Sequence, residues 1–222
     1  STPEGSYATD PNGPIRTVEF RKMVQSLSRI GLRVVMDVVY NHTHACCQGQ
    51  KSVLDRIVPG YYYRLDKNGN VYNTSCCPDT ASERAMMEKL IVDSLVLWAR
   101  EYKVDGFRFD LMGHHTTGNM KKIRAALDGL TLEKDGVDGQ KIYLYGEGWR
   151  FGSLYETMPD EACHQVNAFG LGIGTFNDRI RDCLRGGNFE HATRADQGFL
   201  TGLYYDYNRD PACKETPPEL AR

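Results

Sequence analysis

The chain has 222 residues, of which 41% are hydrophobic, so it is long enough to bury the core of one sizeable domain. Its formal net charge of −2 argues against nucleic acid as the main partner, because surfaces that bind nucleic acid are strongly basic. No apolar run approaches the roughly 20 residues that cross a membrane, so no membrane partner is expected.

The cysteines argue for thiols rather than for a disulfide framework or a zinc site. An odd count of seven without C-x-x-C spacing fits neither arrangement. We therefore expect reduced thiols in a reducing compartment such as the cytoplasm or a plastid. A bridge between the two adjacent pairs, and secretion, stay open as alternatives. The cysteines are the pairs Cys46-Cys47 and Cys76-Cys77 and the single residues Cys163, Cys183 and Cys213.

The first part of the chain predicts a loop, a helix, a strand and an insertion. Residues 1–16 are rich in turn-forming Pro, Gly and Asn and predict a loop. Thr17 is a candidate N-cap for an amphipathic helix that ends at Gly31. Residues 32–39 form a nearly continuous apolar run, typical of a strand buried on both faces. The irregular stretch 44–80 is long for a plain connection and predicts a small inserted subdomain.

The rest of the chain alternates between helices and strands, which is typical of a parallel α/β sheet. The further elements expected are helices at 82–101, 120–127 and 178–184 and strands at 104–110, 142–147 and 170–177. Four strands are half of the eight that close a (β/α)8 barrel. We therefore expect residues 1–222 to form an incomplete (β/α)8 TIM barrel, with 44–80 inserted and a frayed polar tail from Arg209.

The strand at 104–110 carries the first candidate catalytic group. Alternate side chains of a strand face the same side, so Phe107 and Phe109 are expected to pack in the core. Arg108 and Asp110 then face a polar pocket. The guanidinium favours the ionised carboxylate, which suits Asp110 for the role of a nucleophile. Taken alone, the same pattern equally fits a purely structural Arg-Asp pair.

A second carboxylate, Glu147, closes the strand at 142–147. It stands between Gly146 and Gly148, which we interpret as allowing a substrate close to the backbone, and Trp149 follows. Barrel enzymes present catalytic groups from the carboxyl ends of their strands on one rim. Asp110 and Glu147 are therefore predicted to meet there.

The strand at 32–39 contributes further polar groups. Asp37 interrupts the apolar run and needs a partner, for which Asn41 is the candidate. His42 follows at the tip, where it can donate a hydrogen bond to a substrate. We expect Asp37 to be mainly structural and His42 to face the substrate. The nearby cluster of three tyrosines and an arginine at 61–64 is attributed to loop packing rather than to sugar stacking.

At this point several motifs resemble a known family. Three segments resemble the first three of the four signature regions of the α-amylase superfamily, glycoside hydrolase family 13: 37–43 (DVVYNHT), 106–113 (GFRFDLMG) and 145–149 (YGEGW). Three others look like its pullulanase and limit-dextrinase branch: 3–7 (PEGSY), 80–83 (TASE) and 174–179 (GTFNDR). The resemblance covers residues 3–208. It implies hydrolysis of α-1,6 branch linkages in pullulan, amylopectin, glycogen or limit dextrins.

The resemblance also implies roles for single residues. Asp110 matches the nucleophile, Glu147 the general acid/base and Arg108 the arginine that orients the nucleophile. In the retaining mechanism Asp110 needs this cation, whereas Glu147 does not. Contacts to the substrate are expected from Asp37, Asn41, His42, His115 and Trp149. No metal and no cofactor is required, although a structural calcium ion stays open.

Some expectations limit this interpretation. The fourth signature region, a His-Asp pair, has no match after residue 208, so we expect a partial sequence that is inactive by itself. The residues alone do not separate α-1,6 from α-1,4 cleavage.

A glucan-binding relative without activity is disfavoured, because both carboxylates are present. A metal-dependent barrel hydrolase is disfavoured because Arg108 would repel a cation at Asp110. Its ligands would come from Asp37, His42, His44, His114, His115 and Asp110.

Overall fold

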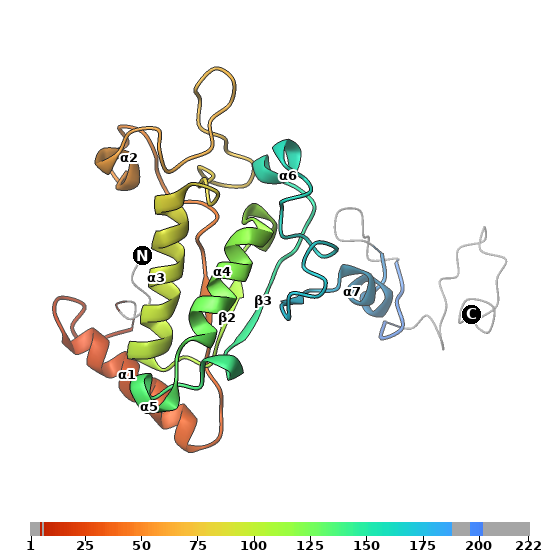
Figure 1. Ribbon diagram of the computed structural model, residues 1–222. Helices are drawn as coiled ribbons and strands as arrows, with labels where there is room; N and C mark the ends of the chain where they lie inside the picture. The colour runs from red at the N-terminus through yellow and green to blue at the C-terminus, as the bar shows by residue number, and fades with distance from the viewer. Residues whose placement is uncertain (1–4, 6, 188–195, 202–222) are drawn as a thin grey trace. The chain divides into compact units, whose positions relative to one another are not determined.

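The computed structural model describes residue 5, residues 7–187 and residues 196–201. The chain divides into two compact units, Ser1–Phe176 and Asn177–Arg222, and each is treated by itself below. The first unit contains a parallel sheet with helices packed on it (Figure 1). The polar tail from Arg209, the motif residues 3, 4 and 6 and Cys213 lie outside the described residues.

The sheet has four strands in the order β1-β2-β3-β4, and all three neighbouring pairs are parallel. Because the strands are parallel, their carboxyl ends meet at one edge, as the α/β pattern predicted. The described residues show this open sheet and no closed barrel, so the barrel stays a prediction. The strands are β1 (Val35–Val38), β2 (Gly106–Phe109), β3 (Tyr143–Gly146) and β4 (Gly174–Thr175).

The four predicted helices are present in the predicted order with shifted ends. The helices are α1 (Ile15–Arg29), α2 (Leu54–Ile57), α3 (Ala85–Tyr102), α4 (Thr117–Asp128), α5 (Leu132–Asp135), α6 (Ser153–Thr157) and α7 (Asp178–Arg185), with 3-10 turns η2 (Met112–His114) and η3 (Gly139–Lys141). The short helices α2, α5 and α6 were not predicted. The N-cap of α1 is Pro14 and not Thr17, because the φ of −79° at Pro14 already suits a helix start. The last strand is shorter than the predicted 170–177, since only Gly174 and Thr175 pair with β3.

Helix α4 begins three residues before the predicted Met120 because of its cap. The Thr116 hydroxyl accepts a hydrogen bond from the Asn119 backbone N–H, and the Asn119 side chain accepts one from the Thr116 N–H. This capping box satisfies N–H groups that a helix start leaves unpaired. Apolar spacing detects only the buried face of a helix, so it misses such a polar first turn.

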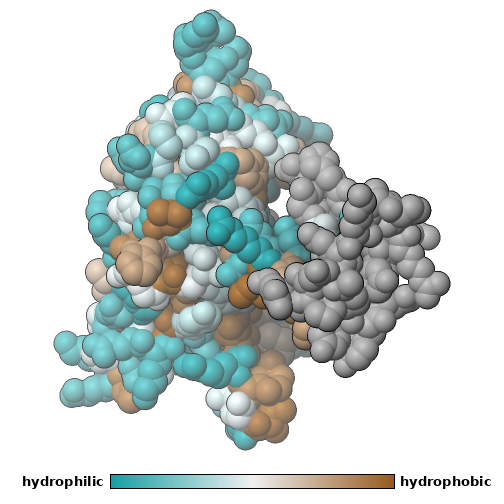
Figure 2. Space-filling view, turned by 90° about the vertical axis from the view of Figure 1, so that its right-hand side faces the viewer, coloured by the Kyte–Doolittle hydropathy of each residue, from teal (hydrophilic) through white to brown (hydrophobic). Residues whose placement is uncertain are grey.

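The core lies between one face of the sheet and helices α3 and α4, which lie side by side (Figure 1). Phe107 and Phe109 are fully buried there, as predicted. The opposite face differs from the prediction for 32–39, because Val35 is exposed and the Asp37 side chain is 63% exposed. Among the described residues no second layer covers that face. Hydrophobic residues stand among hydrophilic ones on the surface in Figure 2.

The segment 44–80 holds the short helix α2 and a few isolated bridges, including Leu65↔Val71 and Tyr63↔Thr80. Tyr63 is fully buried, and its hydroxyl lies 2.6 Å from the Thr43 hydroxyl, which supports the packing role expected for this tyrosine. That residues 44–80 form a separate subdomain stays a prediction.

In the second unit, the Asn177 side chain caps α7 by accepting a hydrogen bond from the Ile180 N–H. Within the described part of the chain, no helix combines the length and the apolar character needed to cross a membrane.

The core predicts unequal effects for two leucines of α3. Leu95 is fully buried, whereas Leu97 is 45% exposed. We expect Leu95→Ala to lower the free energy of unfolding by about 2–5 kcal/mol, because it leaves a cavity under the sheet. The control Leu97→Ala should change it by no more than about 0.5 kcal/mol. Urea unfolding followed by circular dichroism measures both, and equal effects would contradict the assignment of the core.

Candidate active site

One guanidinium group organises the polar edge of the sheet. Arg108 Nη1 lies 2.8 Å from Asp37 Oδ1 and 3.1 Å from Asp110 Oδ1. Its Nη2 lies 2.6 Å from Glu147 Oε1. Asp37 pairs in register with Arg108 across β1 and β2, and Asp110 and Glu147 follow the ends of β2 and β3. Parallel strands in this register therefore bring three carboxylates to one cation.

The contacts keep Arg108 charged. Burial by itself lowers the pKa of Arg108, but the hydrogen bond to Asp37 and the negative charges of Glu147 and Asp37 outweigh it and raise that pKa. The Phe176 ring lies 5.7 Å from the Arg108 guanidinium carbon and shields one side of it. A permanent cation that touches both candidate catalytic carboxyl groups holds them close together. The expectation that only Asp110 has an arginine partner is wrong, because Glu147 shares it.

Asn41 has a different partner from the one predicted. It is fully buried, and its amide nitrogen lies 3.1 Å from Asp110 Oδ2 and 2.8 Å from His42 Nδ1. The expected pairing of Asp37 with Asn41 is therefore wrong, since Asp37 binds Arg108. Because the Asn41 amide nitrogen donates to His42 Nδ1, the proton of the neutral imidazole belongs on Nε2. His42 can then donate from Nε2, as a substrate-facing histidine requires.

The backbone of Leu111 completes the surroundings of Glu147. The Leu111 N–H donates to Glu147 Oε2 at 3.1 Å. Leu111 adopts a left-handed conformation with a φ of 38°, which is unusual for a residue with a branched side chain. This turn directly after Asp110 aims the N–H at the second carboxylate. Sequence analysis missed it, because a backbone donor leaves no mark in the residue type.

The glycines beside Glu147 serve packing rather than access for a substrate. A Cβ atom at Gly146 would lie 2.7 Å from the Phe109 carbonyl oxygen, and one at Gly148 would lie 2.8 Å from the Gln165 nitrogen. Both glycines are buried. Their absence of a side chain lets neighbouring backbone segments approach Glu147, so the earlier interpretation is corrected.

His115 does not join the polar edge. It is only 1% exposed and packs edge-to-face against Phe109, with ring centroids 6.1 Å apart. Neither of its ring nitrogens has a hydrogen-bond partner among the described residues. Burial, followed by the charges of His114 and Arg64, lowers the pKa of His115 to about 3. This position offers no surface to a sugar, whereas the predicted contact residue Trp149 is partly exposed.

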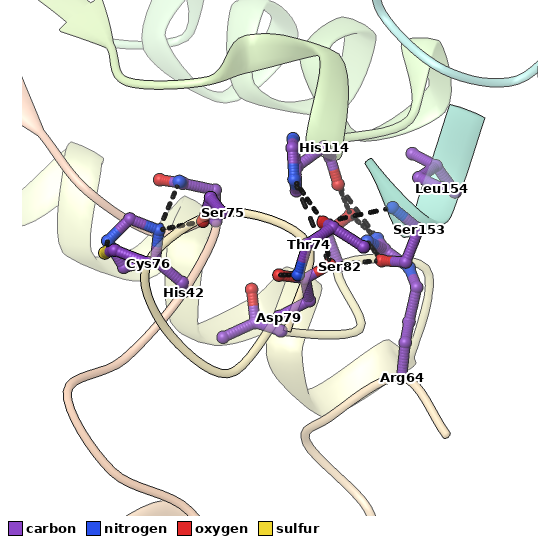
Figure 3. A network of polar contacts seen from close by, with 12 residues as sticks. His42, Arg64, Thr74, Ser75, Cys76, Asp79, Ser82, His114, Ser153 and Leu154 are labelled. Atoms are coloured by element: carbon purple, nitrogen blue, oxygen red, sulfur yellow. Dashed lines mark hydrogen bonds and ion pairs between the residues drawn. The ribbon is translucent and has the colours of Figure 1, made fainter. Parts of the chain in front are cut away.

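A buried polar network joins the segment 44–80 to the site (Figure 3). Asp79 Oδ2 accepts hydrogen bonds from the Thr74 hydroxyl at 2.5 Å and the Ser153 hydroxyl at 2.6 Å. Arg64 Nη2 donates to the His114 carbonyl oxygen at 2.8 Å. The network thus links this segment to α6 and to the turn after β2. Arg64 stood out in the sequence, but nothing there indicated these partners.

Metal-ligating residues gather at two places in the described part of the chain. These are His42 with Cys76 and Cys77, and Asp55 with Cys46 and Cys47. The ligand set considered for a metal-dependent hydrolase is not among them. Neither group is the all-oxygen set that calcium prefers, so the calcium ion stays a prediction. The six described cysteines are free thiols.

Comparison with known proteins adds independent evidence, although no family model matches the chain. It is 52% identical over 220 residues to "Pullulanase 1, chloroplastic" of Arabidopsis thaliana, covering 98% of this chain and 23% of that protein. It is 45% identical over 208 residues to the pullulanase of Klebsiella pneumoniae, covering 91% of this chain and 18% of that protein. The chain thus spans about a fifth of the length of these relatives.

The fold agrees with these relatives. The crystal structure of the maltotriose complex of PulA from Klebsiella pneumoniae matches with a TM-score of 0.80 and 44% identity, over 90% of this chain and 21% of that one. The fold of this chain therefore matches that of proteins in the glycoside hydrolase class. More closely, the chain belongs to the pullulanase branch of glycoside hydrolase family 13.

The packing around Glu147 predicts that Gly146 cannot be enlarged. We expect Gly146→Ala to lower the free energy of unfolding by about 1–3 kcal/mol, because the new methyl group collides with backbone. The control is Gly118→Ala in α4, where a Cβ would lie 3.4 Å from the Thr116 hydroxyl, an ordinary contact. The control should be neutral or stabilising by up to about 1 kcal/mol. Urea unfolding measures the free energy of unfolding of both variants. An unchanged value for Gly146→Ala would contradict the close packing around Glu147.

The burial of His115 predicts acid sensitivity. Its pKa of about 3 lies below the ordinary value of 6.5, so its contribution to stability is complete above pH 6.5 and is lost as the pH falls. Between pH 7 and pH 5 this loss should be about 2 kcal/mol. His115→Phe should remove this loss of stability between pH 7 and pH 5, whereas the control His44→Gln at an exposed position should not. Urea unfolding at both pH values measures it, and an unchanged pH dependence in His115→Phe would refute the assignment.

Proposed function

We propose that this chain carries the catalytic centre of an enzyme that hydrolyses α-1,6-glucosidic branch linkages in pullulan, starch or limit dextrins. The observation that carries the proposal is the single Arg108 guanidinium that contacts both Asp110 and Glu147. The relatives named as pullulanases, and the maltotriose in a similar structure, support an α-glucan substrate.

The proposed reaction is a retaining double displacement, in which two carboxyl groups stand about 5–5.5 Å apart. Asp110 attacks the anomeric carbon while Glu147 gives its proton to the bridging oxygen. The glycosidic C–O bond breaks, the leaving sugar departs and an ester forms on Asp110. Glu147 then takes a proton from water as that water attacks the anomeric carbon. The ester is cleaved, and the sugar leaves with its original configuration.

Arg108 and Asp37 have connected roles in this cycle. Ester formation removes the charge of Asp110, so Arg108 needs another anion to stay in place. The 2.8 Å contact to Asp37 supplies that anion throughout the reaction. Glu147 has to exchange its contact with Arg108 for the bridging oxygen of the substrate. Asp37 is then a positioning residue, and no cofactor takes part in the mechanism.

The substrate contacts follow from the same edge of the sheet. His42 donates from Nε2, and Asn41 holds the imidazole in that tautomer while it also binds Asp110. Trp149 directly follows this edge and offers an indole for packing on a sugar ring. We infer a partial (β/α)8 barrel over residues 1–222, with 44–80 as an insertion beside the site. The fourth-region aspartate has no counterpart here, so turnover is expected only from a longer polypeptide.

The roles of the two carboxylates are tested by isosteric amides in the complete polypeptide that carries these residues. Asp110→Asn and Glu147→Gln should each lower kcat on pullulan by about 10³-fold or more, because each removes one half of the double displacement. Asp93→Asn and Glu156→Gln, on the outside of helices α3 and α6, are the matched controls and should leave kcat unchanged. Release of reducing ends measures turnover. Retained turnover in either site variant would defeat its assigned role.

The linkage and the stereochemistry are tested on the same reaction. Cleavage of α-1,6 bonds in pullulan releases maltotriose, whereas α-1,4 cleavage, the alternative activity, releases trisaccharides that keep an α-1,6 bond. Proton NMR of the first product should show the α-anomer before mutarotation. A β-anomer as the first product would refute the retaining mechanism.

A further inference from the structure

A cluster of sulfur and nitrogen atoms lies beside the candidate active site. It comprises His42, Cys76 and Cys77, which each offer one ligand atom within 4.8 Å of the other two. Cys76 Sγ lies 3.7 Å from His42 Nε2. Figure 3 shows the two residues next to each other. Cys76 is exposed and the other two are partly exposed, so a cation can reach them from solvent. We propose that this cluster binds a thiophilic divalent cation such as Zn²⁺, which inhibits the enzyme.

The ligand set and spacing suit zinc. Two thiolates and one imidazole are three of the four ligands of a tetrahedral zinc site. With Zn–S bonds of about 2.3 Å and Zn–N bonds of about 2.0 Å, the ligand atoms of such a site lie roughly 3.5–3.8 Å apart. The 3.7 Å between Cys76 and His42 already agrees with this spacing. The Cys77 thiol lies within 4.8 Å of both other ligand atoms, so reaching this spacing takes a shift of about 1 Å at most. The fourth position is left for water.

The backbone on both sides of the two cysteines is held in place. Before them, the Thr74 hydroxyl donates to Asp79 Oδ2 at 2.5 Å. After them, Asp79 forms an isolated antiparallel bridge with His42, and the Thr80 N–H donates to the Asn41 carbonyl oxygen at 2.9 Å. These contacts keep the segment that carries Cys76 and Cys77 against His42. The ligands are therefore brought together before any cation arrives.

A cation at this cluster would also disturb the nucleophile. A metal bound to His42 Nε2 leaves the ring proton on Nδ1. The Nδ1–H group then points at the amide N–H of Asn41, so that two donors face each other and no hydrogen bond forms. Asn41 can relieve this by turning its Oδ1 toward Nδ1–H, since that oxygen is buried without a hydrogen-bond partner among the described residues. The turn withdraws the amide N–H from Asp110 Oδ2. Binding thus removes a donor to the substrate and a donor to Asp110.

The chain supplies a matched control in its second cysteine pair. Cys46 and Cys47 also neighbour a carboxylate, Asp55. The two oxygens of Asp55 already accept hydrogen bonds from the Cys47 and Gly60 N–H groups, and its side chain is buried. Its carboxylate is therefore committed to the backbone. Serine substitutions at this pair change the same residue types in the same segment without touching the proposed site.

The first experiment measures binding alone. The complete polypeptide, reduced with a phosphine, is titrated with Co²⁺, and Zn²⁺ is then added in competition. We expect thiolate-to-cobalt charge-transfer absorption that saturates at one equivalent and is removed by Zn²⁺. The double variant Cys76→Ser/Cys77→Ser should lose this band, and Cys46→Ser/Cys47→Ser should keep it. An undiminished band in the Cys76/Cys77 variant, or no band in the unaltered protein, would overturn the site.

The second experiment measures inhibition, which rests on the proposed function. Zn²⁺ should inhibit pullulan hydrolysis by the unaltered protein and by Cys46→Ser/Cys47→Ser at the same concentration. The Cys76→Ser/Cys77→Ser variant should need at least a tenfold higher concentration, with unchanged activity in the absence of metal. Equal sensitivity of the two double variants would overturn the inhibitory role. A protein that hydrolyses no α-glucan would refute the proposed function, while the cobalt spectra still decide the metal site.

Discussion

The polar edge of the sheet depends on one cation, the guanidinium of Arg108, which holds carboxylates that follow or belong to three strands. Without it, Asp37, Asp110 and Glu147 would repel one another at short range in a partly buried place. The planar fork of arginine can serve several oxygens at once, which the point charge of a lysine cannot. The register of β1, β2 and β3 is therefore part of the chemistry and not only of the fold.

Around this centre, each neighbouring group has one orienting task. Asn41 joins Asp110 to His42 and sets the tautomer of the imidazole. Leu111 turns its N–H toward Glu147 from an unusual backbone conformation, a small local strain of the kind that is common at functional sites. The buried network of Asp79 brings a distant loop to the same place. The result is a site in which few side chains are free to move independently.

The same arrangement explains why catalysis and metal inhibition are coupled in our proposals. His42 is the residue that both would use, because its Nε2 faces the side where a sugar or a cation arrives. Cys76 and Cys77 lie beside it because the bridge between His42 and Asp79 and the hydrogen bond from the Thr80 N–H to the Asn41 carbonyl oxygen hold their segment there. A cation at the thiols and a glucan at the carboxylates would therefore compete for one imidazole. The amide of Asn41 would carry the effect of the cation to Asp110.

The sequence by itself determined which side chains of the central strand are buried and which carboxylates stand at the ends of β2 and β3. A period of two places Phe107 and Phe109 opposite Arg108 and Asp110, and parallel strands must bring their carboxyl ends to one edge. Only the tertiary structure decided which residues contact one another. In it Asn41 binds Asp110, Arg108 also contacts Glu147, and His115 is buried. It also brings Cys76 next to His42, 34 residues away in sequence. The local pattern of apolar and polar residues determines which face of a helix or strand packs in the core. Partners depend on register and on the paths of loops, which are set by packing of the whole chain.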